Sequence, residues 1–216
     1  MDKGQQVLDA ESFFRMAHVS RETMDRLASY ESLLRKWQNS INLVSKTTLE
    51  DVWRRHFWDS AQVLDLASEN HLRWVDFGSG AGFPGLVLAI LSVERSGFHM
   101  NLVESDQRKS VFLREVIRET GAPATVHTSR IENPLTVKAI GPCDALSARA
   151  CAPLERLLGW SEAYFGPTTT GFFLKGAMAD EELTQARKSW TFSVTSYPSR
   201  ADPDGSVLKV EQLARA

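Results

Sequence analysis

A glycine-rich loop that directly follows an apolar segment carries the residues best suited to hold a ligand. Asp76 ends the apolar segment and Pro84 opens a second apolar run. Three glycines alternate between them, at Gly78, Gly80 and Gly82. Glycines in such a turn let backbone N–H groups approach a ligand closely, and the N-terminus of the following helix attracts negative charge. Pro84 suits the first turn of that helix, because its missing N–H would have no partner there. The loop therefore predicts a cofactor cradle.

The glycine spacing selects among the nucleotide cofactors. Gly78 and Gly80 fit the dinucleotide pattern G-x-G-x-x-G, but Phe83 stands where a small residue must let helix and strand touch. No Gly-Lys-Ser/Thr follows, so the loop is not a P-loop. A G-x-G-x-G loop after an acid-ended strand is typical of S-adenosylmethionine enzymes of the Rossmann-like class. We therefore expect Asp76, Gly78, Gly80 and Phe83 to bind that cofactor, with a purely structural glycine turn as the alternative.

Residues after the next two expected strands complete this site. Glu104 ends the second strand, where a carboxylate accepts hydrogen bonds from ribose hydroxyls, and Ser105 follows it. Ser105 or Asp106 would also serve as the N-cap of the next helix. After the third strand, Ile131 is expected against the adenine ring, with Glu132 beside it.

Basic residues follow the fourth and fifth expected strands, at Arg149 and Lys175. Open α/β sheets place their sites at the carboxyl ends of strands. Both residues are therefore candidates for the catalytic site. Arg149 is expected to bind an anionic group such as a cofactor carboxylate, and Lys175 a phosphate. Surface salt bridges are the alternative for each.

Two patterns suggest nucleophilic chemistry that we disfavour. Cys151 lies where a cytosine-C5 methyltransferase would place its nucleophile, but the Pro-Cys or Thr-Cys motif of those enzymes is absent, so a packing role is expected. His56, Asp59 and Ser60 resemble a hydrolase triad, but neighbouring helical residues do not make that geometry and no G-x-S-x-G elbow exists. We expect Asp59 to cap a helix, and Arg55 with His56 to face the pocket.

The elements that must position these residues alternate from residue 73 onward. Strands are expected at 74–77, 98–103, 124–127, 143–148, 171–175, 192–197 and 207–210, with helices near 84–94, 106–120, 153–165 and 180–189. This alternation predicts an α/β fold, a seven-stranded and mainly parallel sheet with helices on both faces. The turn from Pro198 to Gly205 predicts an antiparallel hairpin at the edge.

The first 70 residues are expected to be helical. Ser20 is a plausible N-cap for a helix over 21–39, and Gly121 ends the 106–120 helix. Thr47 with Glu50 forms a capping box for a helix that runs through residue 57, and a short helix then follows from Asp59. We therefore divide the chain into a helical extension, 1–70, and a Rossmann-like methyltransferase domain, 71–216.

Composition limits the classes of protein that the chain can belong to. Its 216 residues suffice for one α/β domain with an appendage, and its net charge of −2 argues against a generic polyanion binder. Two cysteines give neither metal spacing nor a disulfide framework. No run approaches a membrane span, and the first residues lack a signal-peptide core. We expect a cytoplasmic enzyme without metal or membrane partner.

Taken together, several segments give the chain a family resemblance. They comprise the glycine loop and the following stretches: Trp37–Leu43, Arg55–Ser60, Arg108-Lys109, Phe112-Leu113, Ser129–Glu132, Ser147–Ala150 and Leu174–Gly176. With these the chain resembles the bacterial small-subunit rRNA guanine-N7 methyltransferases, the glucose-inhibited division protein B family. By this resemblance Gly78, Phe83, Ile131, Glu132 and Arg149 fall on cofactor positions. Phe83 stands where other members often have leucine, and residues 199–216 lack the basic residues that many members carry.

The resemblance implies methyl transfer from S-adenosylmethionine to N7 of one guanine in a decoding-region loop of 16S rRNA, either naked or in an assembling small subunit, with no DNA substrate. Arg149 would then bind the cofactor carboxylate or an RNA phosphate, and Lys175 a phosphate near the target guanine. We expect the RNA contacts to come from the following basic residues: Arg54, Arg55, His56, Arg130 and Lys175. Guanine N7 carries a lone pair and no proton, so this chemistry needs placement and electrostatics rather than a base, and positioning alone contributes roughly 7–11 kcal/mol. Exocyclic-amine methylation is disfavoured, since no Asp/Asn-Pro-Pro-aromatic motif follows the fourth strand. The alternatives are a small-molecule or other nucleotide methyltransferase, including cytosine-C5 chemistry through Cys151, and an RNA-binding module without catalysis.

Overall fold

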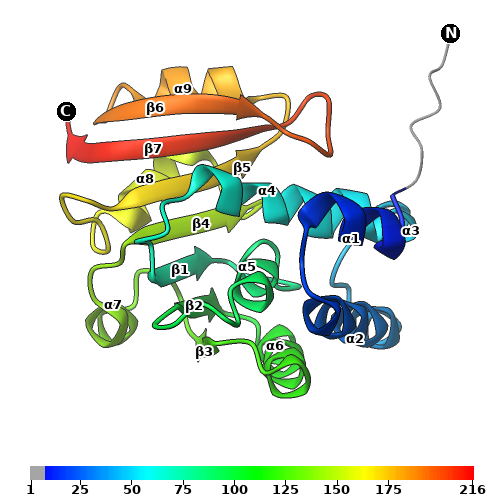
Figure 1. The fold of residues 1–216 in the computed structure, drawn as a ribbon. Helices are drawn as coiled ribbons and strands as arrows, with labels where there is room; N and C mark the ends of the chain where they lie inside the picture. Colours follow the sequence, from blue (N-terminus) through cyan, green and yellow to red (C-terminus); the bar gives the residue numbers. More distant parts are fainter. Residues whose placement is uncertain (1–7) are drawn as a thin grey trace, which may run out of the picture.

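A seven-stranded sheet forms the centre of the computed structural model, which describes residues 8–216 (Figure 1). Its order is β3-β2-β1-β4-β5-β7-β6. The strands are β1 (Arg73–Phe77), β2 (His99–Glu104), β3 (Ala124–Thr128), β4 (Ala145–Arg149), β5 (Thr170–Lys175), β6 (Trp190–Pro198) and β7 (Ser206–Arg215). The first five are parallel, and β7 runs antiparallel to both β5 and β6. The expected fold class and the edge hairpin are confirmed.

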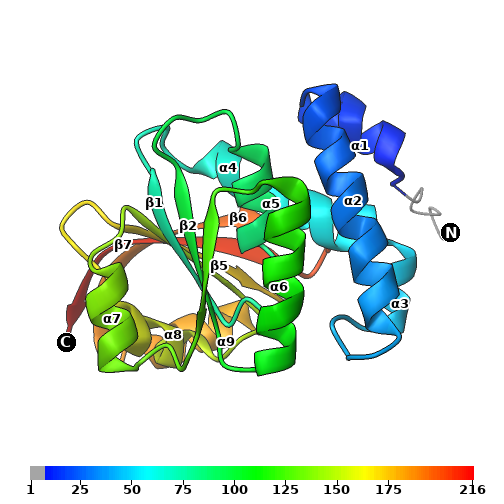
Figure 2. The ribbon, with the colours of Figure 1, turned by 90° about the horizontal axis from the view of Figure 1, so that it is seen from below.

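Helices cover both faces of the sheet (Figure 2). One face carries α4 (Asp59–Leu66), α5 (Gly85–Leu91) and α6 (Gln107–Thr120), and the other carries α7 (Pro134–Ile140), α8 (Leu154–Ser161) and α9 (Ala179–Ala186). Successive strand residues point to opposite faces. Trp74 of β1 accordingly packs in the hydrophobic cluster under α4, α5 and α6, whereas Val75 and Phe77 pack in the cluster under α7, α8 and α9. Burial on both faces explains why these strands are apolar throughout.

Helices at the N-terminus pack beside the sheet-covering helices (Figure 2). They are α1 (Ala10–Ala17), α2 (Arg21–Gln38), α3 (Lys46–Glu50) and a π-helical segment, η1 (Trp53–Trp58), that continues into α4. Helix α2 lies against α5 and α6, and α1 and α3 lie against α2 or η1. Leu27 and Leu34 belong to the same buried cluster as Leu86 and Phe112 of the sheet-covering helices. The extension therefore shares one hydrophobic core with the sheet-covering helices. The division of the chain into a helical extension, 1–70, and a methyltransferase domain, 71–216, stays a prediction.

Helix caps show where local sequence determined the elements. Ser20 caps α2 by accepting from Thr23 N at 3.2 Å, and Gly121 ends α6 with φ of 65°, as predicted. The capping box at Thr47 is wrong, because Ser45 caps α3 instead and the helix breaks at Asp51. Asp59 caps no helix, since η1 runs into α4 without interruption.

Two helices were missed by periodicity, although each has a local signal. Asp9 caps α1 by accepting from Ser12 N at 2.8 Å. Asn133 caps α7, Pro134 occupies its first position and Gly141 ends it. Both helices are shorter than three turns, so their apolar stripes are too brief to stand out. Residues 1–7 of the segment compared above with a signal peptide lie outside the described residues. Within residues 8–216, none of the helices combines the length and apolar character needed to cross a bilayer.

Candidate functional site

Two adjoining cavities lie at the carboxyl edge of the parallel strands, where the predicted site residues meet. The first, which we call the loop cavity, has a volume of about 470 Å³ and is lined by the glycine loop and by residues that follow β2, β3 and β4. The second, the adjoining cavity, has a volume of about 580 Å³ and is lined by residues of η1, of β5 and of the β6–β7 turn. Five residues line both: Leu43, Val44, Arg149, Ala150 and Cys151.

Most predicted site residues line one cavity or the other. The loop cavity is bordered by the following predicted residues: Gly78, Gly80, Phe83, Glu104, Ser105, Arg130, Ile131, Glu132 and Arg149. The adjoining cavity is bordered by Arg55, His56, Arg149 and Lys175. Asp76 and Arg54 line neither cavity. The roles assigned to these residues stay predictions, but the fold brings the sequence-distant groups together.

The glycine loop has backbone conformations that residues other than glycine rarely adopt. Gly78 and Gly80 have φ of 60° and 57°, in the left-handed region. Glu104 fixes the loop to the second strand, because its Oε2 accepts from Gly80 N at 2.8 Å and its Oε1 from Asp106 N at 2.7 Å. A carboxylate has about four lone-pair positions, so these two bonds leave acceptor capacity for ribose hydroxyls. Asp106, rather than Ser105, caps α6.

Tyr30 of α2 supports the loop from the side of the helical extension, a contact that sequence reasoning missed. Its hydroxyl donates to the carbonyl of Ala81, and its ring stacks on Phe83 with centroids 5.3 Å apart. Tyr30 is fully buried, and Phe83 is nearly so. The only local signal is a tyrosine on the apolar stripe of 21–39. The helical extension therefore contributes directly to loop geometry.

Asp76 lies beneath the loop, against the neighbouring strand. Its Oδ1 accepts from Ser147 Oγ at 2.7 Å, in a register that places the two residues side by side on β1 and β4. Its Oδ2 is buried and has no hydrogen-bond partner within residues 8–216. Burial raises the pKa of this carboxyl to about 6. Asp76 does not line the loop cavity, whereas Gly78, Ser79 and Gly80 of the following loop do. Its position therefore suits it to hold the loop in place from beneath.

Arg149, at the end of β4, sits where the two cavities join. Its guanidinium donates to the Arg55 carbonyl at 3.0 Å and to His56 Nδ1 at 2.7 Å, and lies 3.4 Å from Asp59 Oδ2. The guanidinium carbon also lies 5.0 Å from the centroid of the Phe83 ring. Desolvation lowers the pKa of Arg149, and Asp59 opposes this effect. Arg149 is thus held in one orientation by groups from η1, α4 and the glycine loop.

Lys175, at the end of β5, is held by neighbouring residues. Its Nζ donates to the Ala152 carbonyl at 2.7 Å and pairs with Glu182 of α9 at 2.7 Å. Glu182 also accepts from Leu154 N at 2.6 Å, at the start of α8. This network ties β5, α8 and α9 to the segment after β4, where Ala150 has a left-handed φ of 50°. The ammonium is therefore positioned at the rim of the adjoining cavity rather than free in solvent.

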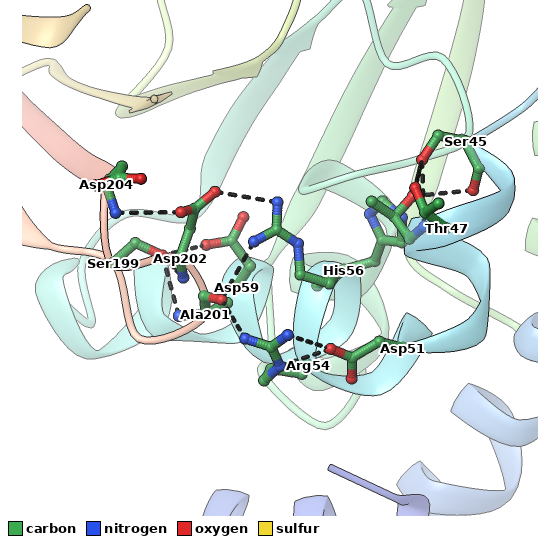
Figure 3. Close-up of polar contacts among 12 residues, drawn as sticks. Ser45, Thr47, Asp51, Arg54, His56, Asp59, Ser199, Ala201, Asp202 and Asp204 are labelled. Carbon is green, nitrogen blue, oxygen red and sulfur yellow. Dashed lines mark hydrogen bonds and ion pairs between the residues drawn. The ribbon is translucent and has the colours of Figure 1, made fainter. Parts of the chain in front are cut away.

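The predicted RNA-contacting residues Arg54 and Arg55 both contact the turn between β6 and β7. Figure 3 shows Arg54 beside Ala201 of that turn. Arg54 donates to the Ala201 carbonyl at 2.9 Å and pairs with Asp51, and Arg55 pairs with Asp202 at 3.0 Å. In the same turn Ser199 Oγ donates to Asp59 Oδ1 at 2.9 Å. The turn is thereby fastened to the helical extension, and the Arg54 side chain is largely buried in this contact.

Cys151 has the environment of a packing residue. It is half-buried beside the glycine loop, and burial raises the pKa of its thiol to about 11. A thiol of that pKa is neutral near pH 7, whereas a nucleophile must be a thiolate. The burial of this thiol thus disfavours attack on a pyrimidine by Cys151, in agreement with the packing role expected from the sequence.

The strand order, the loop after β1 and the acid that ends β2 define a Rossmann-like methyltransferase. Solved structures support the fold: a putative O-methyltransferase from Klebsiella pneumoniae matches with a TM-score of 0.59 at 14% identity, covering 94% of this chain and 96% of that one. A mutant of MtNAS in complex with S-adenosylmethionine matches with a TM-score of 0.55 at 17% identity, covering 96% of this chain and 85% of that one.

Sequence comparison identifies the family. The GidB family model, described as rRNA small subunit methyltransferase G, matches residues 23–205. Ribosomal RNA small subunit methyltransferase G of Parvibaculum lavamentivorans is 61% identical over 210 residues, covering 97% of this chain and 92% of that protein. The protein of the same name from Rhodospirillum centenum is 54% identical, covering 91% and 87%. The chain belongs to the GidB family and is a methyltransferase, which confirms the resemblance.

Proposed function

We propose that this enzyme transfers a methyl group from S-adenosylmethionine, held in the loop cavity, to N7 of one guanine of 16S rRNA, held in the adjoining cavity. The observation that supports this most directly is the junction of the two cavities at Arg149, Ala150 and Cys151. A donor and an acceptor placed in the two cavities would meet at this junction. Methyl transfer by direct displacement requires such an arrangement.

The residues of the loop cavity fit S-adenosylmethionine. The conformation of Gly78 leaves the loop backbone open to a ligand, and Glu104 retains acceptor positions for ribose hydroxyls. Ile131 offers an apolar surface for the adenine, with Glu132 beside it, while Arg149 offers a cation for the carboxylate of the methionine part. The bound cofactor supplies an electrophilic methyl group on its sulfonium.

The adjoining cavity suits a base acceptor that carries no proton. Guanine N7 attacks through a lone pair, so no side chain has to remove a proton. The imidazole and the carboxylates that line the cavity are already engaged. His56 accepts from Arg149, and burial lowers its pKa to about 2. The three carboxylates are paired with cations: Asp59 with Arg149, Glu182 with Lys175 and Asp202 with Arg55. What the protein supplies is the position of the reactants and the electrostatics around them.

A base within folded RNA must be exposed or extruded to reach this junction. The rim of the adjoining cavity carries Lys175 and Arg55, which would hold the phosphates that flank such a base. Both cations are already paired, with Glu182 and Asp202. RNA binding then involves exchange of a carboxylate partner for a phosphate, and we expect its affinity to fall steeply with salt.

Mass spectrometry of 16S rRNA from cells with and without the gene tests the proposal. We expect one N7-methylguanine to disappear on deletion and to return when purified enzyme and S-adenosylmethionine are added to the unmethylated RNA or subunit. Persistence of every N7-methylguanine in the deletion strain would contradict the proposal. Turnover with free nucleosides at the rate seen with RNA would instead favour the small-molecule alternative.

A further inference from the structure

The side-chain contact between His56 and Arg149 is an unusual pairing for a buried histidine. The imidazole is 6% exposed, and its ring stacks on Phe83 with centroids 4.7 Å apart and an interplanar angle of 20°. Arg149 lies against the same Phe83 ring and donates to His56 Nδ1 at 2.7 Å. An arginine near a cavity is usually held by carboxylates, yet its shortest contact with a side chain here is to a histidine.

The donor chemistry determines the tautomer. A guanidinium has only N–H donors, so Nδ1 of His56 must be the acceptor and carries no proton. In the neutral ring the proton therefore lies on Nε2. That nitrogen is buried, and residues 8–216 offer it no hydrogen-bond partner. A buried donor without an acceptor destabilises the fold, so its presence needs an explanation.

We propose that His56 is a positioning residue, a neutral acceptor that orients Arg149 without cancelling its positive charge. This inference rests on the proposed function, in which Arg149 presents a cation to the cofactor carboxylate or to RNA. Asp59 is the other side-chain acceptor, but at 3.4 Å its contact with the guanidinium is longer, and its Oδ1 also accepts from Ser199 and Gln62. A carboxylate in the place of His56 would hold Arg149 equally well while neutralising it.

The surroundings of the ring keep it neutral. Desolvation lowers the pKa of His56 to about 2, and the positive charges of Arg149 and Arg55 act in the same direction. The ring is therefore a neutral acceptor near pH 7. Burial against Phe83 therefore also keeps Arg149 in place, because a protonated imidazole could not accept its hydrogen bond and would repel the guanidinium.

Three substitutions separate orientation from charge. His56→Leu removes the acceptor, His56→Asn restores a neutral acceptor near the position of Nδ1, and His56→Asp restores an acceptor with a negative charge. We expect His56→Leu to lower kcat/KM for RNA roughly 10- to 100-fold, the range for losing a hydrogen bond to a charged group. His56→Asn should recover most of that loss. His56→Asp should melt no lower than His56→Asn yet bind both S-adenosylmethionine and RNA more weakly.

Equal activity of the Leu and Asn variants would overturn the proposal, as would equal activity of the Asn and Asp variants. If His56→Leu fails to fold, the Asn and Asp pair still decides the question. A measurement on the wild type is independent of catalysis: ¹⁵N NMR of histidine side chains at pH 7 should show His56 protonated on Nε2 alone. A proton on Nδ1 would overturn the positioning role. Absence of methyl transfer by the wild type would instead count against the proposed function and leave the NMR result unchanged.

Discussion

The thiol of Cys151 packs against Gly78, in the space that a Cβ at position 78 would occupy. The two residues belong to the segments after β4 and β1, which are neighbouring strands of the sheet. The contact joins the glycine loop to the segment 149–151, which lines both cavities. It also explains why a small side chain suits position 151 without any role for sulfur chemistry.

Replacing Gly78 by alanine should abolish cofactor binding. The new Cβ would collide with Cys151, and the left-handed φ of 60° costs a non-glycine residue about 1–2 kcal/mol. Calorimetric titration with S-adenosylmethionine measures the loss. Gly159→Ala is the matched control, because its Cβ would meet only Trp190 at an ordinary 3.8 Å within helix α8. Unchanged affinity in Gly78→Ala would show that the loop does not hold the cofactor.

Replacing Cys151 by alanine should leave methyl transfer close to the wild-type rate. The thiol is neutral, and the lost packing of one half-buried sulfur costs about 1 kcal/mol of stability. Single-turnover assays with radiolabelled cofactor and unmethylated 16S rRNA measure the rate. Near-total loss of transfer in a folded variant would support the alternative in which Cys151 is a covalent nucleophile.

Replacing Tyr30 by phenylalanine should destabilise the protein and weaken cofactor binding together. The variant keeps the ring that stacks on Phe83 but leaves the buried carbonyl of Ala81 without its donor, which costs about 1–3 kcal/mol. Urea denaturation and calorimetric titration give the two quantities. Full affinity at reduced stability would mean that Tyr30 supports the fold but not the loop.

Asp76→Asn should change how stability depends on pH. The folded pKa of about 6 lies above the ordinary value of 3.8, so the folded state binds the extra proton between these values. Wild-type stability from this group is therefore present below pH 4 and is lost as the pH rises to 6, by about 3 kcal/mol. The free energy of unfolding of the variant, relative to wild type, should rise by that order between pH 4 and 6. A constant difference across this range would contradict the raised pKa.

Asp202→Asn should strengthen RNA binding by releasing Arg55 from its ion pair. The pair is about one-third exposed on each side, so its loss costs less than about 1 kcal/mol of stability. Filter binding of a 16S rRNA fragment at several salt concentrations should show tighter binding and a steeper salt dependence. Asp204→Asn removes the same charge from the same turn without an ion pair at Arg55 and should change neither. Equal effects of the two variants would indicate a general charge effect.

The sequence by itself predicted the alternation of strands and helices from residue 73 onward, the fold class and the family, because these depend on local features. Glycine spacing, strand-ending acids and hydrophobic periodicity are read within short windows. The carboxyl-edge positions of Glu104, Arg149 and Lys175 followed from the parallel sheet alone.

Only the tertiary structure decided what the charged side chains do. Arg54 and Arg55 looked like free cations in the sequence, but the β6–β7 turn, far away along the chain, supplies their partners. Asp59 looked like a helix cap and instead contacts Arg149 and Ser199. Burial turned His56 from a titrating group into a neutral acceptor. Charge pairing and desolvation depend on what the fold brings close from elsewhere, so no local pattern of residues can specify them.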